Sequence, residues 1–350
     1  IERWHQQYEK EGLKIKGKYY LTQHPNYPNF RTVGIEHMTP QEREILEKWA
    51  SMEPLKGDTL TYPGCNMILT STLTQSSIFS ELDIRGRLEY CCGETLFRTG
   101  YADRLFEVTA RLDKWFNHLK PRNLLVLCTA GTNVFRNVLP NYGLTYKFDK
   151  ITSYLEWLWE RFENEEIKIS NPLSYSVTIQ DSCYSKMFGE NYMDIPRKIL
   201  EKIGCKIIEM PAIRENMRCC GIAGGFSVDA AYDPFKIRSA TCRNLDDARA
   251  TKADILCVYC SGCLQTYSIA KKLYFKPKTQ PIYHIIELIQ MAIGETPQKL
   301  IERTASNIYW GIVRHQFPKL LSGKKIKLSE IPVDPRSEEH TSELQSPNTI

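Results

Sequence analysis

Periodic apolar positions divide most of the chain into amphipathic helices and short buried strands. In residues 101–119 the apolar side chains recur at three- and four-residue steps, which predicts one helix with a single apolar stripe. The runs NLLVLC at 123–128 and DILCVYC at 254–260 are nearly continuous in apolar residues. Because each run follows a predicted helix, both runs indicate buried parallel strands.

The two ends of the sequence differ from this central pattern. Residues 1–57 are polar and helix-prone, and we expect a helical connector or docking arm there. Within it, Thr39, Pro40 and Glu42 have the spacing of a capping box, which predicts the start of a helix. We expect a helical extension over residues 296–335. Residues 336–350 resemble the translation of a sequencing adapter, and we leave them out of the fold prediction.

Length and composition restrict the class of protein. The chain has 350 residues, enough for about two domains. It is 42% hydrophobic and 25% charged, with no apolar run long enough to cross a membrane. The net charge of +5 is mild, and no basic stripe with interleaved aromatic residues points to nucleic acid. We therefore expect a cytoplasmic protein that does not bind nucleic acid and that can meet a membrane only through a partner.

The twelve cysteines are the feature of the composition that indicates a specific chemistry. Disulfide scaffolds are typical of short secreted chains, whereas this chain is long and crowds its cysteines into adjacent pairs and close triplets. Reduced, metal-binding thiolates are the favoured interpretation. The cysteines are Cys65, Cys91, Cys92, Cys128, Cys183, Cys205, Cys219, Cys220, Cys242, Cys257, Cys260 and Cys263.

A pattern of strands, helices and cysteines begins at residue 58 and occurs twice. Each copy has a strand followed by a cysteine, a helix before a Cys-Cys-Gly triplet, a second helix, an apolar strand and a final cysteine. The first copy (58–165) places these cysteines at Cys65, Cys91, Cys92 and Cys128, and the second (172–295) places them at Cys183, Cys219, Cys220, Cys260 and Cys263. A repeat of this size indicates a duplicated α/β unit with a short parallel sheet.

The second copy offers five cysteines from three chain segments, each at a strand end or a strand-to-helix turn. Loops at the carboxyl ends of parallel strands converge on one crevice. Five soft thiolates there suit an iron–sulfur cluster, whereas a structural zinc site takes four ligands. Gly221, Gly224 and Gly225 remove side chains where the backbone has to approach such a group.

Four motifs carry a resemblance to a known family. YPGC, CCGETLFRTGY, MRCCGIAGG and YCSGCLQTY resemble the cysteine-rich, Cys-Cys-Gly domain family over about residues 58–295. That family includes the catalytic subunits of heterodisulfide reductases. It also includes iron–sulfur subunits of glycerol-3-phosphate, glycolate and lactate dehydrogenases and of thiol:fumarate reductase. The expected fold class is α/β, with two tandem Rossmann-like units of pseudo-twofold symmetry and a helical N-terminal arm.

The resemblance implies a cofactor for each copy. In the heterodisulfide reductase branch, five cysteines of a complete motif hold a noncubane 4Fe-4S cluster, and the second copy matches all five positions. The first copy matches four positions and departs at the fifth, where CTAG places Gly131. A cubane cluster at the first copy and a vestigial site both stay open.

The remaining candidates have simpler interpretations. Cys205, Cys242 and Cys257 are expected to be small buried residues of a strand, a helix and a strand. His284 resembles a histidine that follows the motif in relatives, and packing at a helix N-terminus is its expected role.

The resulting functional hypothesis is an iron–sulfur oxidoreductase that reduces or forms a disulfide of small thiols. The alternative is a non-catalytic electron-relay subunit of a flavin-linked dehydrogenase, and a structural zinc protein is the third. The sequence contains no ferredoxin-type C-x-x-C-x-x-C-x-x-x-C-P run. We therefore expect electrons from a partner, which would be a ferredoxin-like subunit, a flavoprotein or a cytochrome b, or from an N-terminal segment that this sequence lacks.

Overall fold

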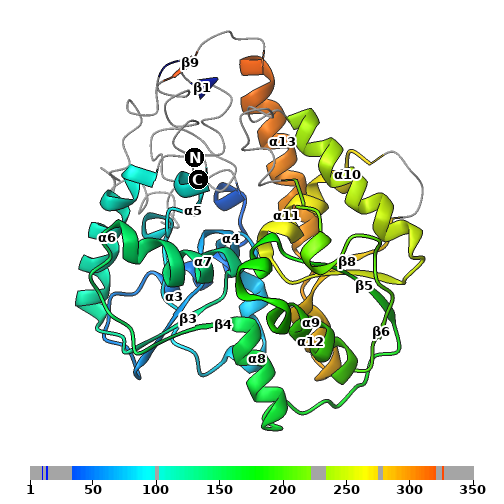
Figure 1. Ribbon diagram of the computed structural model, residues 1–350, viewed down its shortest axis with the longest axis horizontal. Helices are drawn as coiled ribbons and strands as arrows, with labels where there is room; N and C mark the ends of the chain where they lie inside the picture. The colour runs from blue at the N-terminus through cyan, green and yellow to red at the C-terminus, as the bar shows by residue number, and fades with distance from the viewer. Residues whose placement is uncertain are drawn as a thin grey trace.

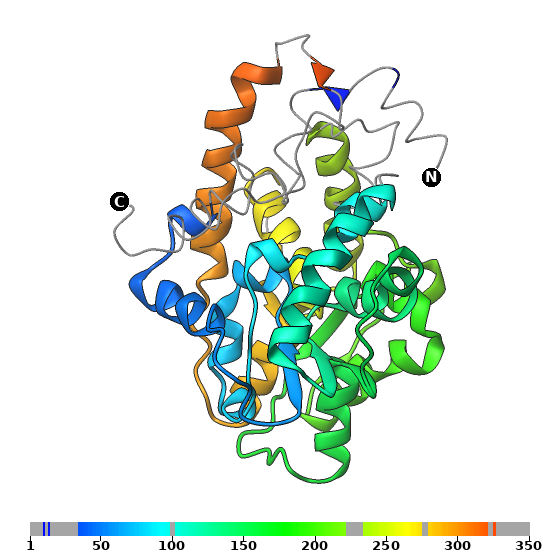
Figure 2. The ribbon, with the colours of Figure 1, turned by 90° about the vertical axis from the view of Figure 1, so that its left-hand side faces the viewer.

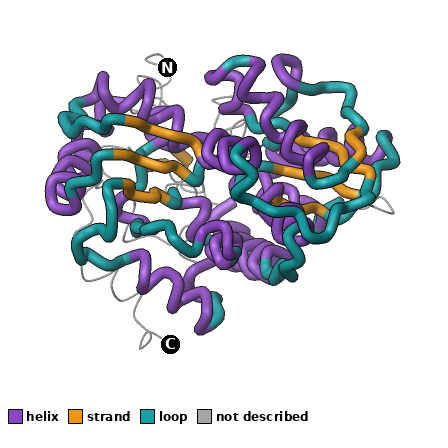
Figure 3. The backbone as a smooth tube through the Cα atoms, turned by 90° about the horizontal axis from the view of Figure 1, so that it is seen from below, coloured by secondary structure: helices purple, strands orange, loops and turns teal. Residues whose placement is uncertain are grey.

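The protein is a mixed α/β structure with two parallel sheets that lie in separate halves. The computed structural model describes residue 10, residues 13–14, 34–98, 102–221, 234–274, 279–320 and 325–326. Figure 1 shows the sheet of the first half on the left and the sheet of the second half on the right, each with helices packed around it. Seen from below, the strands form two groups with helices between and around them (Figure 3). The α/β class expected from the sequence is confirmed.

The first half contains a three-stranded sheet in the order β2-β3-β4. Its strands are β2 (Thr59–Tyr62), β3 (Asn123–Val126) and β4 (Lys150–Ser153), and both neighbouring pairs are parallel. Each strand is a short run whose side chains are almost completely buried at the end that precedes the next loop. This arrangement brings the loops after β2 and β3 to the same edge of the sheet.

The second half contains a four-stranded parallel sheet in the order β6-β5-β7-β8. Its strands are β5 (Ser176–Gln180), β6 (Lys206–Ile207), β7 (Ile255–Val258) and β8 (Ile282–His284). The strands predicted within 123–128 and 254–260 are confirmed as β3 and β7, and β5 is the strand expected before Cys183. The short strand β6 lies between the first cysteine and the Cys-Cys pair of this half. At the same place in the first half, Ile84 forms an isolated parallel bridge with Thr61 of β2.

Helices cover the sheets and begin at many of the strand ends. The α-helices are α3 (Pro40–Trp49), α4 (Cys65–Ile68), α5 (Glu94–Arg98), α6 (Leu105–Leu119), α7 (Thr129–Asn133), α8 (Tyr154–Glu163), α9 (Glu190–Lys202), α10 (Pro234–Ala250), α11 (Ser261–Lys271), α12 (Ile285–Ala292) and α13 (Ile301–Leu320). A π-helix (Val134–Val138) continues α7. The 3-10 helices are Ser71–Gln75, Ser77–Phe79, Leu88–Tyr90, Ala102–Arg104, Leu139–Tyr142, Cys183–Phe188 and Arg214–Asn216.

Local sequence signals account for where several helices begin and end. The capping box at Thr39 and Glu42 is present at the start of α3. The apolar stripe of α6 is buried along its whole length, as predicted. Helix α9 is followed by Gly204 with φ +94°, the left-handed conformation expected of a glycine that ends a helix.

Helix α13 and a two-stranded antiparallel pair lie at one end of the molecule (Figure 2). The pair joins β1 (Leu13–Lys14) to β9 (Lys325–Ile326). None of the helices in the described part of the chain is both long and apolar enough to cross a membrane. The proposed tail at 336–350 and most of residues 1–33 lie outside the described residues.

Candidate cysteine sites

The five cysteines predicted to form one group in the second half are close to one another. We call Cys183, Cys219, Cys220, Cys260 and Cys263 the second cysteine site. Cys183 begins the 3-10 helix after β5, and the pair Cys219 and Cys220 ends a loop that follows β6. Cys260 is the N-cap residue of α11, and Cys263 lies in the first turn of that helix. Three segments that are distant in sequence thus meet at the carboxyl edge of the sheet.

Hydrogen bonds between thiols link the second cysteine site. Cys183 pairs with Cys219, and Cys263 pairs with both Cys220 and Cys260. The hydrogen bond from Cys263 lowers the pKa of Cys260 to about 7. The bond to Cys219, together with burial, raises the pKa of Cys183. Cys260 therefore loses its proton more readily than Cys183 or Cys263, whose pKa values are raised.

Side chains of β5 and α10 fix the backbone of the Cys-Cys pair. The Asn244 Nδ2 amide donates to the carbonyl oxygen of Cys219 at 2.8 Å, and the Thr241 hydroxyl donates to that of Cys220 at 2.6 Å. Gln180 Nε2 donates to the carbonyl oxygen of Arg218 at 2.9 Å. These bonds satisfy carbonyl groups in a loop that lacks regular structure, and they set where the two thiols lie.

The four cysteines predicted in the first half also gather. We call Cys65, Cys91, Cys92 and Cys128 the first cysteine site. Cys65 begins α4, the Cys91–Cys92 pair precedes α5, and Cys128 is the N-cap residue of α7. The Sγ atoms of Cys65 and Cys91 are 3.5 Å apart, and Cys92 pairs with Cys91, which raises the pKa of Cys92.

Glycine permits the close approach within the first cysteine site. Gly64 has φ +76°, and a Cβ atom there would lie 2.8 Å from the Cβ of Cys128. The fifth position, Gly131, lies in α7, and its N–H contacts the Cys128 sulfur at 3.5 Å. The site therefore has four thiols where the second has five.

The two cysteine sites adjoin each other. Burial and the negative charge of Cys260 raise the pKa of Cys128 to about 12, so thiols of the two halves interact. Asn66, which follows Cys65, accepts a hydrogen bond at its carbonyl oxygen from Gln265 Nε2 at 2.6 Å. A Cβ at Gly262 would lie 2.9 Å from the Asn66 side chain, so glycine is needed for this contact.

A second contact between the halves involves charged residues beside the sites. The hydroxyl of Tyr184, next to Cys183, donates to the Glu94 carboxylate from the first half. Glu94 in turn pairs with Arg98, whose Nε lies 2.7 Å from Glu94 Oε1. The positive charge of Arg98 acts on Cys183 and Cys219. No sequence pattern signals this bridge, because Tyr184 and Glu94 are 90 residues apart.

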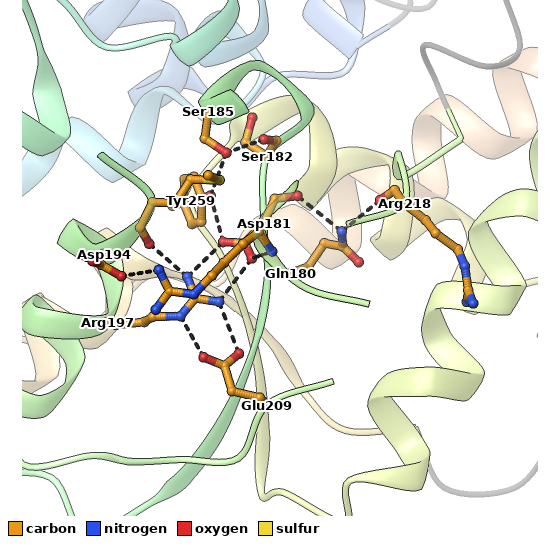
Figure 4. Close-up of polar contacts among 11 residues, drawn as sticks. Gln180, Asp181, Ser182, Ser185, Asp194, Arg197, Glu209, Arg218 and Tyr259 are labelled. Atoms are coloured by element: carbon orange, nitrogen blue, oxygen red, sulfur yellow. Dashed lines mark hydrogen bonds and ion pairs between the residues drawn. The ribbon is translucent and has the colours of Figure 1, made fainter. Parts of the chain in front are cut away.

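An ionic network that sequence reasoning missed is built around Asp181, two residues before Cys183 (Figure 4). We call the buried carboxylate of Asp181 and the groups bound to it the Asp181 network. Arg197 donates from both terminal nitrogens to the two Asp181 oxygens at 3.0 Å, and also pairs with Glu209. The backbone N–H of Arg214 and the hydroxyl of Tyr259 donate to the same carboxylate at 2.8 and 2.9 Å.

The remaining candidates have structural positions outside the two cysteine sites. Cys205 and Cys257 are buried in the core, as predicted. Cys242 lies within α10, as predicted, but it is only partly buried. His284 is the N-cap residue of α12, where its Nδ1 accepts from the N–H of Ile286 at 3.3 Å. Burial lowers the pKa of His284 to about 3, so the ring stays neutral. Gly224 and Gly225 lie outside the described residues.

The thiols are linked in short groups of two or three rather than gathered around a single point. Among the described residues, no three His, Cys, Asp or Glu side chains surround one position in the way that a single metal ion requires. A polynuclear cluster differs from a single ion because its thiolates bind different metal atoms. This arrangement of linked thiols is compatible with that kind of cofactor.

Comparison with known proteins identifies the second half. Residues 177–267, which include all five thiols of the second cysteine site, match the model of the CCG cysteine-rich domain. This segment is similar to the CCG cysteine-rich domain family. The resemblance read from the Cys-Cys-Gly motifs is thereby confirmed for the half with the complete motif.

Relatives of the CCG domain protein extend the likeness to the first half. The chain is 28% identical over 258 residues to one subunit of the dihydromethanophenazine:CoB–CoM heterodisulfide reductase of Methanosarcina mazei, covering 68% of this chain and 60% of that one. It is 27% identical to the "Probable iron-sulfur-binding oxidoreductase FadF" of Bacillus subtilis, covering 63% and 30%. It is 24% identical to the "EtfAB:quinone oxidoreductase" of Syntrophomonas wolfei, covering 59% and 29%. The chain thus spans about a third to about three-fifths of these relatives.

Proposed function

We propose that this chain is an iron–sulfur oxidoreductase of heterodisulfide reductase type. It reduces, or in reverse forms, a disulfide of small thiols at a 4Fe-4S cluster held by the second cysteine site. The observation that supports this most is the meeting of five thiols from three segments at one edge of a parallel sheet. The names of the relatives, which describe iron–sulfur binding and oxidoreductase activity, support the same class.

The donor set of the second cysteine site fits such a cluster. All five candidate ligands are sulfur, the donor that iron–sulfur clusters take, and each is linked by a hydrogen bond to another thiol of the site. A structural zinc site would use four and leave one thiol over. The low pKa of Cys260 provides one thiolate, and bound iron would stabilise the others in their deprotonated form.

The proposed reaction balances with two electrons and two protons. The sulfur–sulfur bond of the substrate breaks, and each sulfur leaves as a thiol after it gains one electron and one proton. The bound cluster would supply one-electron transfer and an iron atom that can take a sulfur. The chain contributes the thiols that hold the cluster and a buried surrounding that limits access of water.

The first cysteine site offers four candidate ligands in this proposal, one fewer than the second. Four thiols can hold a cubane cluster, and the site adjoins the second one through Cys128 and Cys260. An electron that enters at the first half would have a short path to the second. If the first site is vestigial it holds no iron, and an iron count distinguishes this outcome from a cubane cluster.

The two halves are proposed to be duplicated units, over residues 58–165 and 172–295, related by a pseudo-twofold axis. The strand orders β2-β3-β4 and β5-β7-β8 support this relation. A shared hydrogen bond supports it as well: Tyr62, the last residue of β2, donates to the carbonyl oxygen of Tyr90 at 2.7 Å, as Gln180, the last residue of β5, donates to that of Arg218. Both acceptors directly precede a Cys-Cys pair.

Electrons are proposed to arrive from a partner subunit. The sequence has no ferredoxin-type cysteine run, and the relatives are longer than this chain. A ferredoxin-like subunit, a flavoprotein or a cytochrome b would each supply single electrons. The alternative function is a relay that passes electrons to another protein and reduces no disulfide, and the experiment has to distinguish the two.

The test compares cysteine variants of the anaerobically purified protein. We expect about four irons at the second site, lost in Cys263→Ala, and disulfide reduction with a reduced viologen dye that is lost with them. Cys128→Ala should lose less activity, because its site already lacks a fifth thiol. Cys205→Ala is the control, since Cys205 belongs to neither site and is buried in the core.

Two outcomes would contradict the proposal. Zinc without acid-labile sulfide would exclude the cluster. Full iron with electron transfer to a dye, but without turnover of any small disulfide, would favour the relay.

A further inference from the structure

The three segments that carry the thiols of the second cysteine site share one buried anchor. Asp181 lies two residues before Cys183, Tyr259 directly precedes Cys260, and Arg214 lies five residues before Cys219. The Asp181 carboxylate is inaccessible to solvent and accepts hydrogen bonds from both of the other segments. The two oxygen atoms of the Asp181 carboxylate therefore connect all three segments (Figure 4).

We propose that Asp181 is the positioning residue of the second cysteine site, holding its three thiol-bearing segments in place for the cluster. This inference rests on the proposed cluster but not on the disulfide reaction. Residues that fix the orientation of ligands without touching the metal commonly control how tightly the metal is held. Asp181 meets that description, because it binds the segments and not the thiols.

The bond to Arg214 shows what the carboxylate does to the backbone. Arg214 has φ +50°, a left-handed conformation that costs energy for a residue with a side chain. Its N–H points at Asp181 Oδ2 at 2.8 Å, and its guanidinium pairs with Asp194 of α9. These contacts hold the turn from which the chain runs to the Cys-Cys pair.

The bond to Tyr259 acts on the third segment. Its hydroxyl lies 2.9 Å from Asp181 Oδ1 and 3.1 Å from the hydroxyl of Ser185, which is in the 3-10 helix that begins at Cys183. Tyr259 is completely buried, so its ring cannot move without disturbing the core. The peptide that enters Cys260 is thus tied to the loop that carries Cys183.

Arg197 makes this anchor possible, and Glu209 provides a matched control. Arg197 neutralises the Asp181 charge with two parallel bonds, which permits full burial of the carboxylate. On its other side Arg197 bonds to Glu209 Oε1 and Oε2 at 2.6 and 3.0 Å. Within the described residues, the hydrogen bonds and ion pairs of the Glu209 carboxylate are those with Arg197. Glu209 itself lies in the loop after β6, ten residues before Cys219, so Glu209→Gln separates loss of this ion pair from loss of the bonds that Asp181 makes to Arg214 and Tyr259.

The experiment compares Asp181→Asn with Glu209→Gln in the holoprotein. Both changes remove one carboxylate from Arg197, so both should lower the melting temperature. Only Asp181→Asn should change the electron paramagnetic resonance spectrum of the reduced second-site cluster. It should also release iron to a chelator about 10- to 100-fold faster than wild type, the usual effect of a lost supporting contact. Glu209→Gln should keep the wild-type spectrum and release rate.

Tyr259→Phe keeps the inference testable if Asp181→Asn does not accumulate. The change removes the hydroxyl with its contacts to Asp181 and Ser185 and keeps the aromatic ring. Its iron release rate should fall between those of wild type and Asp181→Asn. Equal spectra and equal release rates in all the variants would overturn the proposed role.

The wild-type measurements separate this inference from the proposed function. Full iron without disulfide turnover would refute the proposed reaction and leave the Asp181 test intact. A wild-type protein without a cluster would overturn both.

Discussion

The sharpest prediction concerns the position at which the first cysteine site lacks a thiol. Gly131 lies in α7 and has no positive φ, so its backbone accepts a side chain. A Cβ atom there would meet Val126 Cγ1 at 3.2 Å, the Cβ of Cys128 at 3.5 Å and Tyr62 Cε1 at 3.8 Å. Only the first contact is tighter than ordinary, and a shift of a few tenths of an ångström relieves it.

The free energy of folding should therefore change little in Gly131→Cys. Overpacking of a core costs about 1–3 kcal/mol, and a single tight contact belongs at the low end of that range. Removal of a glycine from a helix returns up to about 1 kcal/mol. We expect a net change within about 1 kcal/mol, measured as the urea midpoint against Gly131→Ala, which adds the same Cβ without a thiol.

Iron content is measured in a variant whose second cysteine site cannot hold a cluster. In a Cys263→Ala background, Gly131→Cys should hold more iron than Gly131→Ala, up to about four atoms per chain if the fifth thiol completes the site. Its spectrum should move toward that of the intact second site. Identical iron content and identical spectra in the two double variants would refute the idea that a missing fifth thiol limits the first site.

Two further predictions concern pH and the tail. Burial raises the pKa of Glu287 from 4.5 to about 7, so the folded state holds a proton that the unfolded state has lost between these values, and stability falls as pH rises through this window. Glu287→Gln keeps an oxygen that accepts from the His284 N–H. Its free energy of unfolding should exceed that of wild type by up to about 3 kcal/mol at pH 8.5 and by less at pH 6. A difference that does not depend on pH would contradict this. Deletion of residues 336–350 should leave iron content and melting temperature unchanged, and a fall of several degrees would show that the segment is part of the fold.

Features set by neighbours along the chain could be predicted from the sequence. The stripe of α6, the capping box of α3 and the buried strands β3 and β7 each depend on spacings of a few residues. The grouping of the cysteines followed as well, because strand ends of a parallel sheet meet at one edge. These predictions needed only local periodicity and one general rule of topology.

Contacts between distant segments could not be predicted in the same way. Asp181 binds partners 16, 33 and 78 residues away, and aspartate, arginine and tyrosine are common residues with no distinctive spacing. The contact of Asn66 with Gln265 spans 199 residues and depends on how the two halves pack. Such contacts are fixed by tertiary structure, about which a single sequence carries little information.

The first half lacks a counterpart of the Asp181 carboxylate as well as a fifth thiol. The position that corresponds to Asp181, two residues before the first cysteine, is Pro63, and the position that corresponds to Tyr259 is Leu127. Neither residue can make the hydrogen bonds of the Asp181 network. If Asp181 positions the second site as proposed, the first site lacks both a ligand and the anchor that holds ligands in place. Gly131→Cys would then restore the thiol without the anchor, and its cluster should still lose iron faster than the second site does.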